Sequence, residues 1–212
     1  MGFSVKEIYF TLQGEGAQTG RAAVFCRFSG CNLWTGREQD RAKALCTFCD
    51  TDFVGTDGPG GGKFADEASV VRAVLAAWPE GSVDTHPYVV FTGGEPLLQL
   101  TADLVSACKA AGIEVAIETN GTLLAPPHID WICVSPKPGK DMQQTAGNEL
   151  KLVYPQTACP PENFAHLDFT HFFLQPMDGP DQAQNIQAAA AYCQAHPKWR
   201  LSLQTHKLIG LP

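Results

Sequence analysis

Three cysteines in the first quarter of the chain have a spacing that suits a metal centre. Cys46 and Cys49 form a C-x-x-C pair, and Cys31 precedes Cys46 with fourteen residues between them. Three thiolates can hold three corners of a 4Fe–4S cluster and leave the fourth iron open to a small molecule. Zinc is the alternative, because Cys26 would complete the four thiolates of a closed structural site. Cys26 lies within an apolar run and there is no second C-x-x-C pair, but the cysteines alone leave both interpretations open.

Further along the chain, glycine-rich and polar clusters follow the segments that we expect to be strands. The first is Gly93-Gly94-Glu95-Pro96, where glycine permits a close backbone approach to a ligand and Glu95 can position an ammonium group. Thr92 precedes it, and Ser135-Pro136-Lys137 and Gln175-Pro176-Met177-Asp178 are similar clusters. Because parallel α/β folds gather their sites at the carboxyl ends of the strands, we expect the chemistry at that edge.

The elements that must position these residues alternate between strand and helix. Apolar runs predict strands over 21–29, 88–92, 114–118, 131–134, 150–153, 172–174 and 201–204. Apolar stripes or alanine-rich composition predict helices over 66–78, 101–111 and 186–195. Such alternation indicates a parallel sheet with helical crossovers. We therefore expect α/β architecture: an incomplete β/α barrel of about six parallel strands with few helices, forming one domain over 1–212.

Composition limits the classes of protein to consider. The chain has 212 residues, 44% of them apolar and 17% charged, which is ordinary for a globular enzyme. Its net charge of −7 disfavours binding to nucleic acid or to a membrane surface. We find no apolar stretch of the ~18 residues that a membrane span needs and no signal peptide. The expected location is therefore the cytoplasm, where reduced cysteines more often bind metals or lie buried than form disulfides.

Taken together and in this order, the cysteine and glycine motifs resemble those of the radical S-adenosylmethionine (SAM) superfamily. The resemblance places the aromatic residue of the C-x-x-C pair, Phe48, near the adenine of SAM, and Gly93-Gly94-Glu95-Pro96 near its methionine amino group. The usual cluster spacing of the superfamily is C-x3-C-x2-C. Residues 34–45 are thus expected to fold out as an insert in the cluster loop.

Within that superfamily, the chain resembles the 7-carboxy-7-deazaguanine synthase family over nearly its whole length. Thr11 to Gly16, Arg27, Cys49-Asp50-Thr51, Gln175 to Asp178 and the tail from Gln204 to Pro212 carry this likeness. It implies conversion of 6-carboxy-5,6,7,8-tetrahydropterin to 7-carboxy-7-deazaguanine with loss of ammonia, on the route to queuosine. It also implies Mg²⁺, a homodimer and an external electron donor such as flavodoxin.

The resemblance also implies roles for individual residues. Cys31, Cys46 and Cys49 would bind the 4Fe–4S cluster, and Thr51 would bind magnesium. The implied substrate contacts are Leu12, Gln13, Gly14, Glu15, Arg27, Thr92, His206 and Pro212. The implied SAM contacts are Phe48, Gly93, Gly94, Glu95, Ser135, Pro136, Lys137, Gln175, Pro176, Met177 and Asp178. The residue types agree with these roles, because the Arg27 guanidinium can bind the substrate carboxylate and the Thr51 hydroxyl is an oxygen ligand of the kind that Mg²⁺ prefers.

Plainer interpretations stand beside these. Arg27 can serve an ion pair within its strand, Thr51 can cap a turn, and the end of the chain at Pro212 can be frayed. The Glu118-Thr119-Asn120 segment is ambiguous and is not assigned to the site. For the whole protein, the alternatives are a glycyl-radical enzyme activase, which would act on a protein backbone, and a zinc-stabilised interaction module.

Overall fold

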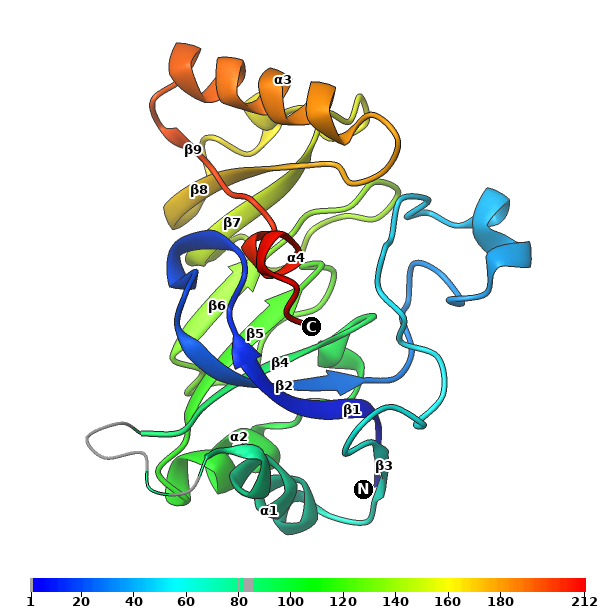
Figure 1. The fold of residues 1–212 in the computed structure, drawn as a ribbon, viewed down its shortest axis with the longest axis vertical. Coiled ribbons are helices and arrows are strands. Elements are labelled where there is room, and N and C mark those ends of the chain that lie inside the picture. Colours follow the sequence, from blue (N-terminus) through cyan, green and yellow to red (C-terminus); the bar gives the residue numbers. More distant parts are fainter. Residues whose placement is uncertain (1, 80, 82–85) are drawn as a thin grey trace.

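In the part of the chain that the structure describes, nine strands form one mixed β-sheet, in the order β3-β1-β2-β4-β5-β6-β7-β8-β9 (Figure 1). The structure is a computed structural model, and it describes residues 2–79, 81 and 86–212. The strands are β1 (Phe3–Leu12), β2 (Ala22–Phe28), β3 (Gly62–Phe64), β4 (Tyr88–Gly93), β5 (Glu114–Thr119), β6 (Trp131–Val134), β7 (Ala146–Tyr154), β8 (Asp168–Pro176) and β9 (Trp199–Leu201). The α-helices are α1 (Glu67–Ala77), α2 (Ala102–Ala110), α3 (Gln182–Ala195) and α4 (Thr205–Ile209). Short 3₁₀-helices are η1 (Gly16–Gln18), η2 (Glu38–Lys43), η3 (Pro96–Leu98) and η4 (Pro161–Asn163).

The strands β2 and β4 to β9 are all parallel to one another. The sheet curves, with α1 and α2 against one end of its outer side and α3 against the other (Figure 1). Two apolar cores fill the space under these helices, one shared by α1, α2 and the strands around β4, the other by α3 and the strands around β8. The predicted partial barrel is confirmed, with seven parallel strands where about six were expected.

Strands β1 and β3 were not predicted, and both are antiparallel additions at the β2 edge of the sheet. Lys6 and Glu7 interrupt the apolar pattern of β1 and hide the strand in the sequence. In the structure these charges have distant partners: the Lys6 ammonium lies 2.9 Å from Asp52 and 2.8 Å from Asp57, and Glu7 accepts from Arg27. Long-range ion pairs therefore permit charges within this strand that local patterning cannot explain.

Capping residues explain why two helices begin where the sequence indicates. The Asp66 carboxylate accepts from the Ser69 amide at 2.8 Å, and the Ser69 hydroxyl accepts in return from the Asp66 amide, so that a capping box starts α1. Thr101 caps α2 as predicted, because its hydroxyl accepts from the Leu104 amide at 3.2 Å. Both helices lie within one residue of the predicted bounds.

Other predicted bounds need correction. Strands β7 and β8 extend beyond 150–153 and 172–174, because their polar first halves pair with each other. Helix α3 begins at Gln182 rather than at 186. The predicted strand 201–204 is wrong beyond Leu201, where β9 ends. The Ser202 hydroxyl accepts from the Gly16 amide and the Gln204 side-chain amide donates to Glu15, so both side chains bond the loop after β1. A short helix that was not predicted, α4, then follows.

The insert at 34–45 projects from the β2 side of the molecule, where the light-blue segment in Figure 1 carries η2. A backbone hydrogen bond of 3.0 Å from the Leu45 amide to the Leu33 carbonyl closes the base of the insert. The predicted outward fold of the insert is therefore observed. Among the described residues, no helix is both long and apolar enough to cross a membrane.

Candidate active site

A cavity of about 390 Å³, here called the sheet cavity, lies on the sheet face that the long helices leave uncovered. Side chains alternate across a strand, and Arg27 and Lys151 line the cavity while their neighbours Cys26 and Leu150 are buried in the cores under the helices. Most of the residues predicted for the site meet here. Those that line the sheet cavity are Leu12, Gln13, Gly14, Glu15, Arg27, Phe48, Cys49, Thr51, Thr92, Gly93, Gly94, Ser135, Lys137, Gln175, Pro176, Met177, Asp178, His206 and Pro212.

The three motif cysteines gather at one end of this cavity. Cys49 lines it, whereas Cys46 is buried and Cys31 half-buried just behind. Gly94 lies directly against Cys31, because a Cβ at Gly94 would come within 2.5 Å of the Cys31 Cβ. Burial raises the pKa of the Cys31 and Cys46 thiols, so both are protonated until a metal displaces the proton. A metal cluster bound here would face the open cavity through Cys49.

Cys26 does not belong to this group. It is fully buried on the opposite face of β2, in the core beneath α1 and α2. Burial strongly raises the pKa of its thiol, which disfavours the thiolate that a metal needs. The four-thiolate zinc site therefore lacks its fourth ligand in this fold.

The glycine turn after β4 is shaped by backbone contacts. Gly93 has φ +147°, and a Cβ there would lie 2.3 Å from the Phe28 carbonyl oxygen. Glu95 is fully buried behind the turn and does not line the cavity. Its carboxylate accepts from the Leu97 and Asn120 amides and from the Thr119 hydroxyl, and so ties β4 to β5. Contact of Glu95 with an ammonium group stays a prediction.

Residues 135–137 divide between two cavities. Ser135 and Lys137 line the sheet cavity, where the Lys137 ammonium lies 6.0 Å from the centre of the Phe48 ring and donates to Ser135. Pro136 instead lines a smaller neighbouring cavity together with residues 137–142 and Cys159. Its predicted contact with SAM is not tested by this placement and stays a prediction.

The loop after β1 enters the sheet cavity and meets a buried lysine. The Glu15 carboxylate accepts from the Lys151 ammonium at 2.6 Å and from the side-chain amides of Gln175 and Gln204 at 3.0 Å each. Burial alone would raise the pKa of Glu15, but the adjacent Lys151 ammonium outweighs it, and the pKa lies below its ordinary value. Glu15 is therefore a carboxylate at neutral pH. The Gln175 side-chain oxygen is buried without a hydrogen-bond partner among the described atoms. Because buried polar atoms usually have a partner, this oxygen is a candidate acceptor for a donor group of a bound ligand.

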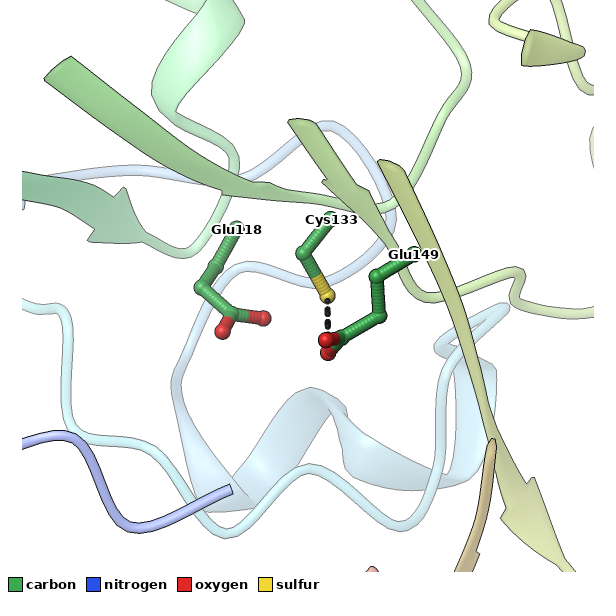
Figure 2. A group of neighbouring side chains, drawn as sticks. All are labelled: Glu118, Cys133 and Glu149. Atoms are coloured by element: carbon green, nitrogen blue, oxygen red, sulfur yellow. Dashed lines mark hydrogen bonds between the residues drawn. The ribbon is translucent and has the colours of Figure 1, made fainter. Parts of the chain in front are cut away.

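Lys151 also joins a buried acidic group that Figure 2 shows, formed by Glu118, Cys133 and Glu149 on three adjacent parallel strands. One ligand atom from each lies within 4.8 Å of the others, a spacing that a metal ion would accept. However, Lys151 donates to Glu118 at 2.9 Å and already supplies a cation. Burial raises the pKa of both Glu149 and Cys133, and the Cys133 thiol donates to Glu149 at 3.2 Å. These groups are better explained as counter-charges that stabilise the buried Lys151 ammonium than as ligands of a metal ion.

Arg27 faces the sheet cavity and is also part of an ion pair. Its Nε donates to Glu7 at 2.7 Å, and one terminal nitrogen donates to the Tyr9 hydroxyl at 3.1 Å. Both partners come from β1, so the antiparallel edge of the sheet fixes the guanidinium against the cavity wall. The ion-pair interpretation and the substrate interpretation are thus compatible, since the guanidinium has further donors.

The end of the chain folds back over the cavity. The Thr11 hydroxyl donates to a carboxyl-terminal oxygen of Pro212 at 3.2 Å, and α4 places His206 against Gly14. A Cβ at Gly14 would come within 2.0 Å of the His206 ring, so only glycine fits there. Burial lowers the pKa of His206 and favours its neutral ring. Lys207 anchors α4 by pairing with Asp50 at 2.7 Å and with Asp178 at 2.6 Å.

Thr51, the predicted magnesium ligand, lines the sheet cavity next to Cys49. None of the described residues hydrogen-bonds its hydroxyl, so that oxygen is free to face a cation. The neighbouring Asp50 is already engaged, because its carboxylate accepts from Lys207. The donor set thus offers one hard oxygen, and Mg²⁺ would complete its six ligands from substrate and water.

Sequence reasoning missed Lys151, Gln204, Glu7 and Tyr9, which all line the cavity or bond its residues. One signal was available for Lys151: a charged residue in the middle of the apolar segment 150–153 indicates a buried partner. Gln204 begins the tail motif that resembles the family but was not assigned to the site, whereas Glu7 and Tyr9 carry no local signal, because their partners are distant in the sequence.

Comparison with known proteins agrees with this geometry. The profile of the Radical SAM superfamily matches residues 40–134. The chain is 66% identical to a 7-carboxy-7-deazaguanine synthase of Bordetella pertussis and 63% identical to one of Caulobacter vibrioides, in both cases over 100% of each chain. The chain belongs to the 7-carboxy-7-deazaguanine synthase family. It is therefore a radical SAM enzyme.

The same family is represented among solved structures. A crystal structure of QueE from Escherichia coli superposes with a TM-score of 0.73 at 26% identity, covering 97% of this chain and 95% of that one. Membership of the radical SAM superfamily implies a 4Fe–4S cluster and SAM. The gathered motif cysteines, the glycine turn against Cys31 and the unpaired Gln175 oxygen fit those two groups.

Proposed function

We propose that this 7-carboxy-7-deazaguanine synthase converts 6-carboxy-5,6,7,8-tetrahydropterin to 7-carboxy-7-deazaguanine with loss of ammonia. The observation that carries the proposal is the composition of one cavity. Cys49 of the predicted cluster motif and the glycine turn line it, together with a guanidinium and an array of acids and amides. A carboxylated, hydrogen-bonding heterocycle matches that array.

Cys31, Cys46 and Cys49 would hold the cluster and leave one iron for SAM. Phe48, Gly93, Gly94, Ser135 and Lys137 line the same end of the cavity and would contact SAM, as would Gln175 to Asp178 on the facing strand end. When bound, the cluster and SAM supply the one-electron chemistry that starts the reaction. The remaining residues bind, orient and protect the substrate.

The substrate residues have matched chemistry. Arg27 would bind the substrate carboxylate, since a fixed guanidinium forms strong, charge-assisted hydrogen bonds. Glu15 would accept from N–H groups of the aminopyrimidinone ring, because Lys151 keeps it ionised. Gln13 would supply the complementary amide, and its nitrogen is already oriented by Glu118 at 3.2 Å. Leu12, Gly14 and Thr92 would complete the walls.

The mouth of the cavity would be closed by the tail and by the metal. Pro212 and His206 line the cavity and would contact the substrate, and the Thr51 hydroxyl would bind Mg²⁺ beside it. The family resemblance further supports a homodimer, a cytoplasmic location and an external electron donor such as flavodoxin.

The proposal is tested by anaerobic turnover. The reconstituted protein is incubated with SAM, a reductant and the carboxytetrahydropterin, and products are identified by mass spectrometry. We expect 7-carboxy-7-deazaguanine and one equivalent of ammonia. A glycyl-radical activase would instead consume SAM only with a protein substrate, and SAM cleavage without change of the pterin would reject the proposal.

A further inference from the structure

We propose that Arg41, in the insert at 34–45, is a positioning residue that holds the cysteine loop 46–49 in its cluster-binding shape. The inference rests on the proposed function, in which Cys31, Cys46 and Cys49 bind the cluster. It adds a role for the insert itself, which distinguishes this chain from the usual spacing of the motif.

The contact is direct. One terminal nitrogen of Arg41 donates to the carbonyl oxygen of Thr47 at 2.9 Å and to that of Cys49 at 3.1 Å. The guanidinium therefore joins two carbonyls on either side of Phe48 and fixes the direction of the loop between them. Hydrogen bonds from an ionised donor are stronger than those between neutral groups. The cysteine loop thus has a fixed support before any cluster is bound.

Arg41 is itself held in place. Its guanidinium carbon lies 4.1 Å from the centre of the Trp34 ring, and its Nε donates to both oxygens of Glu38 at 2.9 and 2.8 Å. Trp34 is buried and meets the buried Phe53 edge-on, with ring centres 5.7 Å apart. The guanidinium is thus anchored on one face to a packed aromatic pair, although the Arg41 side chain remains 29% exposed. A planar guanidinium can stack on Trp34 while it donates both to Glu38 and to the cysteine loop, and a lysine ammonium cannot do this.

The same 3₁₀-helix offers a matched control. Lys43 belongs to η2, is exposed, and makes no hydrogen bond or ion pair with any described residue. Replacing Lys43 by alanine removes the same charge from the same element as replacing Arg41. A difference between the two variants therefore reports the contact with the cysteine loop and not the net charge.

The first test uses the reduced protein without cluster. Cys46 is 4% exposed, so its alkylation by iodoacetamide requires the loop to open. We expect Arg41→Ala to raise the alkylation rate of Cys46, followed by mass spectrometry, about tenfold, and Lys43→Ala to leave it at the wild-type value. Fully buried Cys108 is the internal reference. An equal rise at Cys108 would show general unfolding and overturn the proposal, as would an unchanged rate at Cys46.

The second test uses the reconstituted protein and measures iron release to a ferrous chelator without oxygen. We expect release from Arg41→Ala to be about tenfold faster than from Lys43→Ala, with Arg41→Lys between them. Equal rates for the alanine variants would overturn the proposal. If the wild type bound no cluster, the proposed ligand assignment would fail, whereas the alkylation result would still decide the role of Arg41 in holding the loop.

Discussion

At the scale of single residues, Arg27 shows how a binding group is prepared. The guanidinium is 16% exposed and is fixed by Glu7 and Tyr9 from the neighbouring strand. A side chain that is already held loses little conformational entropy when a ligand arrives. The ion pair with Glu7 is therefore consistent with a substrate role for Arg27, because it fixes the guanidinium before the substrate binds.

Replacement of Arg27 is therefore expected to affect the substrate alone. Arg27→Ala should keep the cluster and SAM and lose about 3–5 kcal/mol of substrate binding, more than a hundredfold in affinity. Arg27→Lys should recover little, because the fork geometry is lost. Substrate affinity measured by equilibrium binding checks this. Arg21→Ala is the control, since Arg21 pairs with Glu114 outside the cavity, and equal affinities of the two alanine variants would exclude the role.

Lys151 is expected to stabilise the fold in a pH-dependent way. Its side chain is 4% exposed between Glu15 and Glu118, so Lys151→Met should cost about 3–5 kcal/mol at pH 7.5 by leaving the carboxylates unpaired. Without the ammonium, burial raises the folded-state pKa of Glu15 above its unfolded value. The penalty is thus largest at high pH and shrinks as the carboxyls protonate on acidification.

Denaturant unfolding at pH 7.5 and pH 5 measures this difference. The control is Lys109→Met, which breaks the half-exposed pair with Asp130 and should cost at most about 1 kcal/mol. A Lys151→Met penalty that is equal at both pH values, or no larger than that of Lys109→Met, would contradict the described charge balance.

How far the sequence predicted the site depends on the kind of residue. Cys31, Cys46 and Cys49 were selected as candidate ligands because their order, together with the glycine motif that follows, resembles a known cluster motif. Arg41 and Glu118 were not assigned, since their roles arise from partners that only the folded chain brings near. Local patterns identify residues that act on a ligand more readily than residues that support them.

At the scale of elements, the same distinction holds. The apolar runs predicted β2, β4, β5 and β6 closely, because parallel strands covered by helices are apolar along their length. The edge strand β1 escaped prediction because ion pairs with distant residues accommodate its charges. The segment 202–204 was predicted as strand, but its polar side chains are used by the loop after β1.

The tail after β9 is the element whose function is most open to test. Helix α4 brings Pro212 to the cavity wall beside Thr11, so residues appended after Pro212 would move the carboxylate and obstruct the mouth. We expect an extended protein to keep its cluster and SAM binding while turnover falls sharply, about a hundredfold. Turnover assays on the wild type and on the extended protein decide the matter. Full activity of the extended protein would show that the position of the chain end does not affect turnover.

At the scale of the whole molecule, the curved sheet brings distant segments to one cavity. The loop after β1, the cysteine loop, the ends of β4, β6 and β8, and the tail all meet on the face that the long helices leave uncovered (Figure 1). Opposite faces of the same strands hold the apolar cores. The alternation of side chains along each strand thereby separates the polar groups that line the cavity from the apolar cores.

The central claim is that three cysteines, and not four, hold a cluster at the end of this cavity. Iron and sulfide content after anaerobic reconstitution tests it most directly, in Cys31→Ala, Cys46→Ala, Cys49→Ala and Cys26→Ala. We expect the wild type and Cys26→Ala to bind about four iron and four sulfide ions per chain, and the other three variants to lose the intact cluster. Loss of iron from Cys26→Ala as complete as from the other variants, or an intact cluster in any of those three, would contradict it.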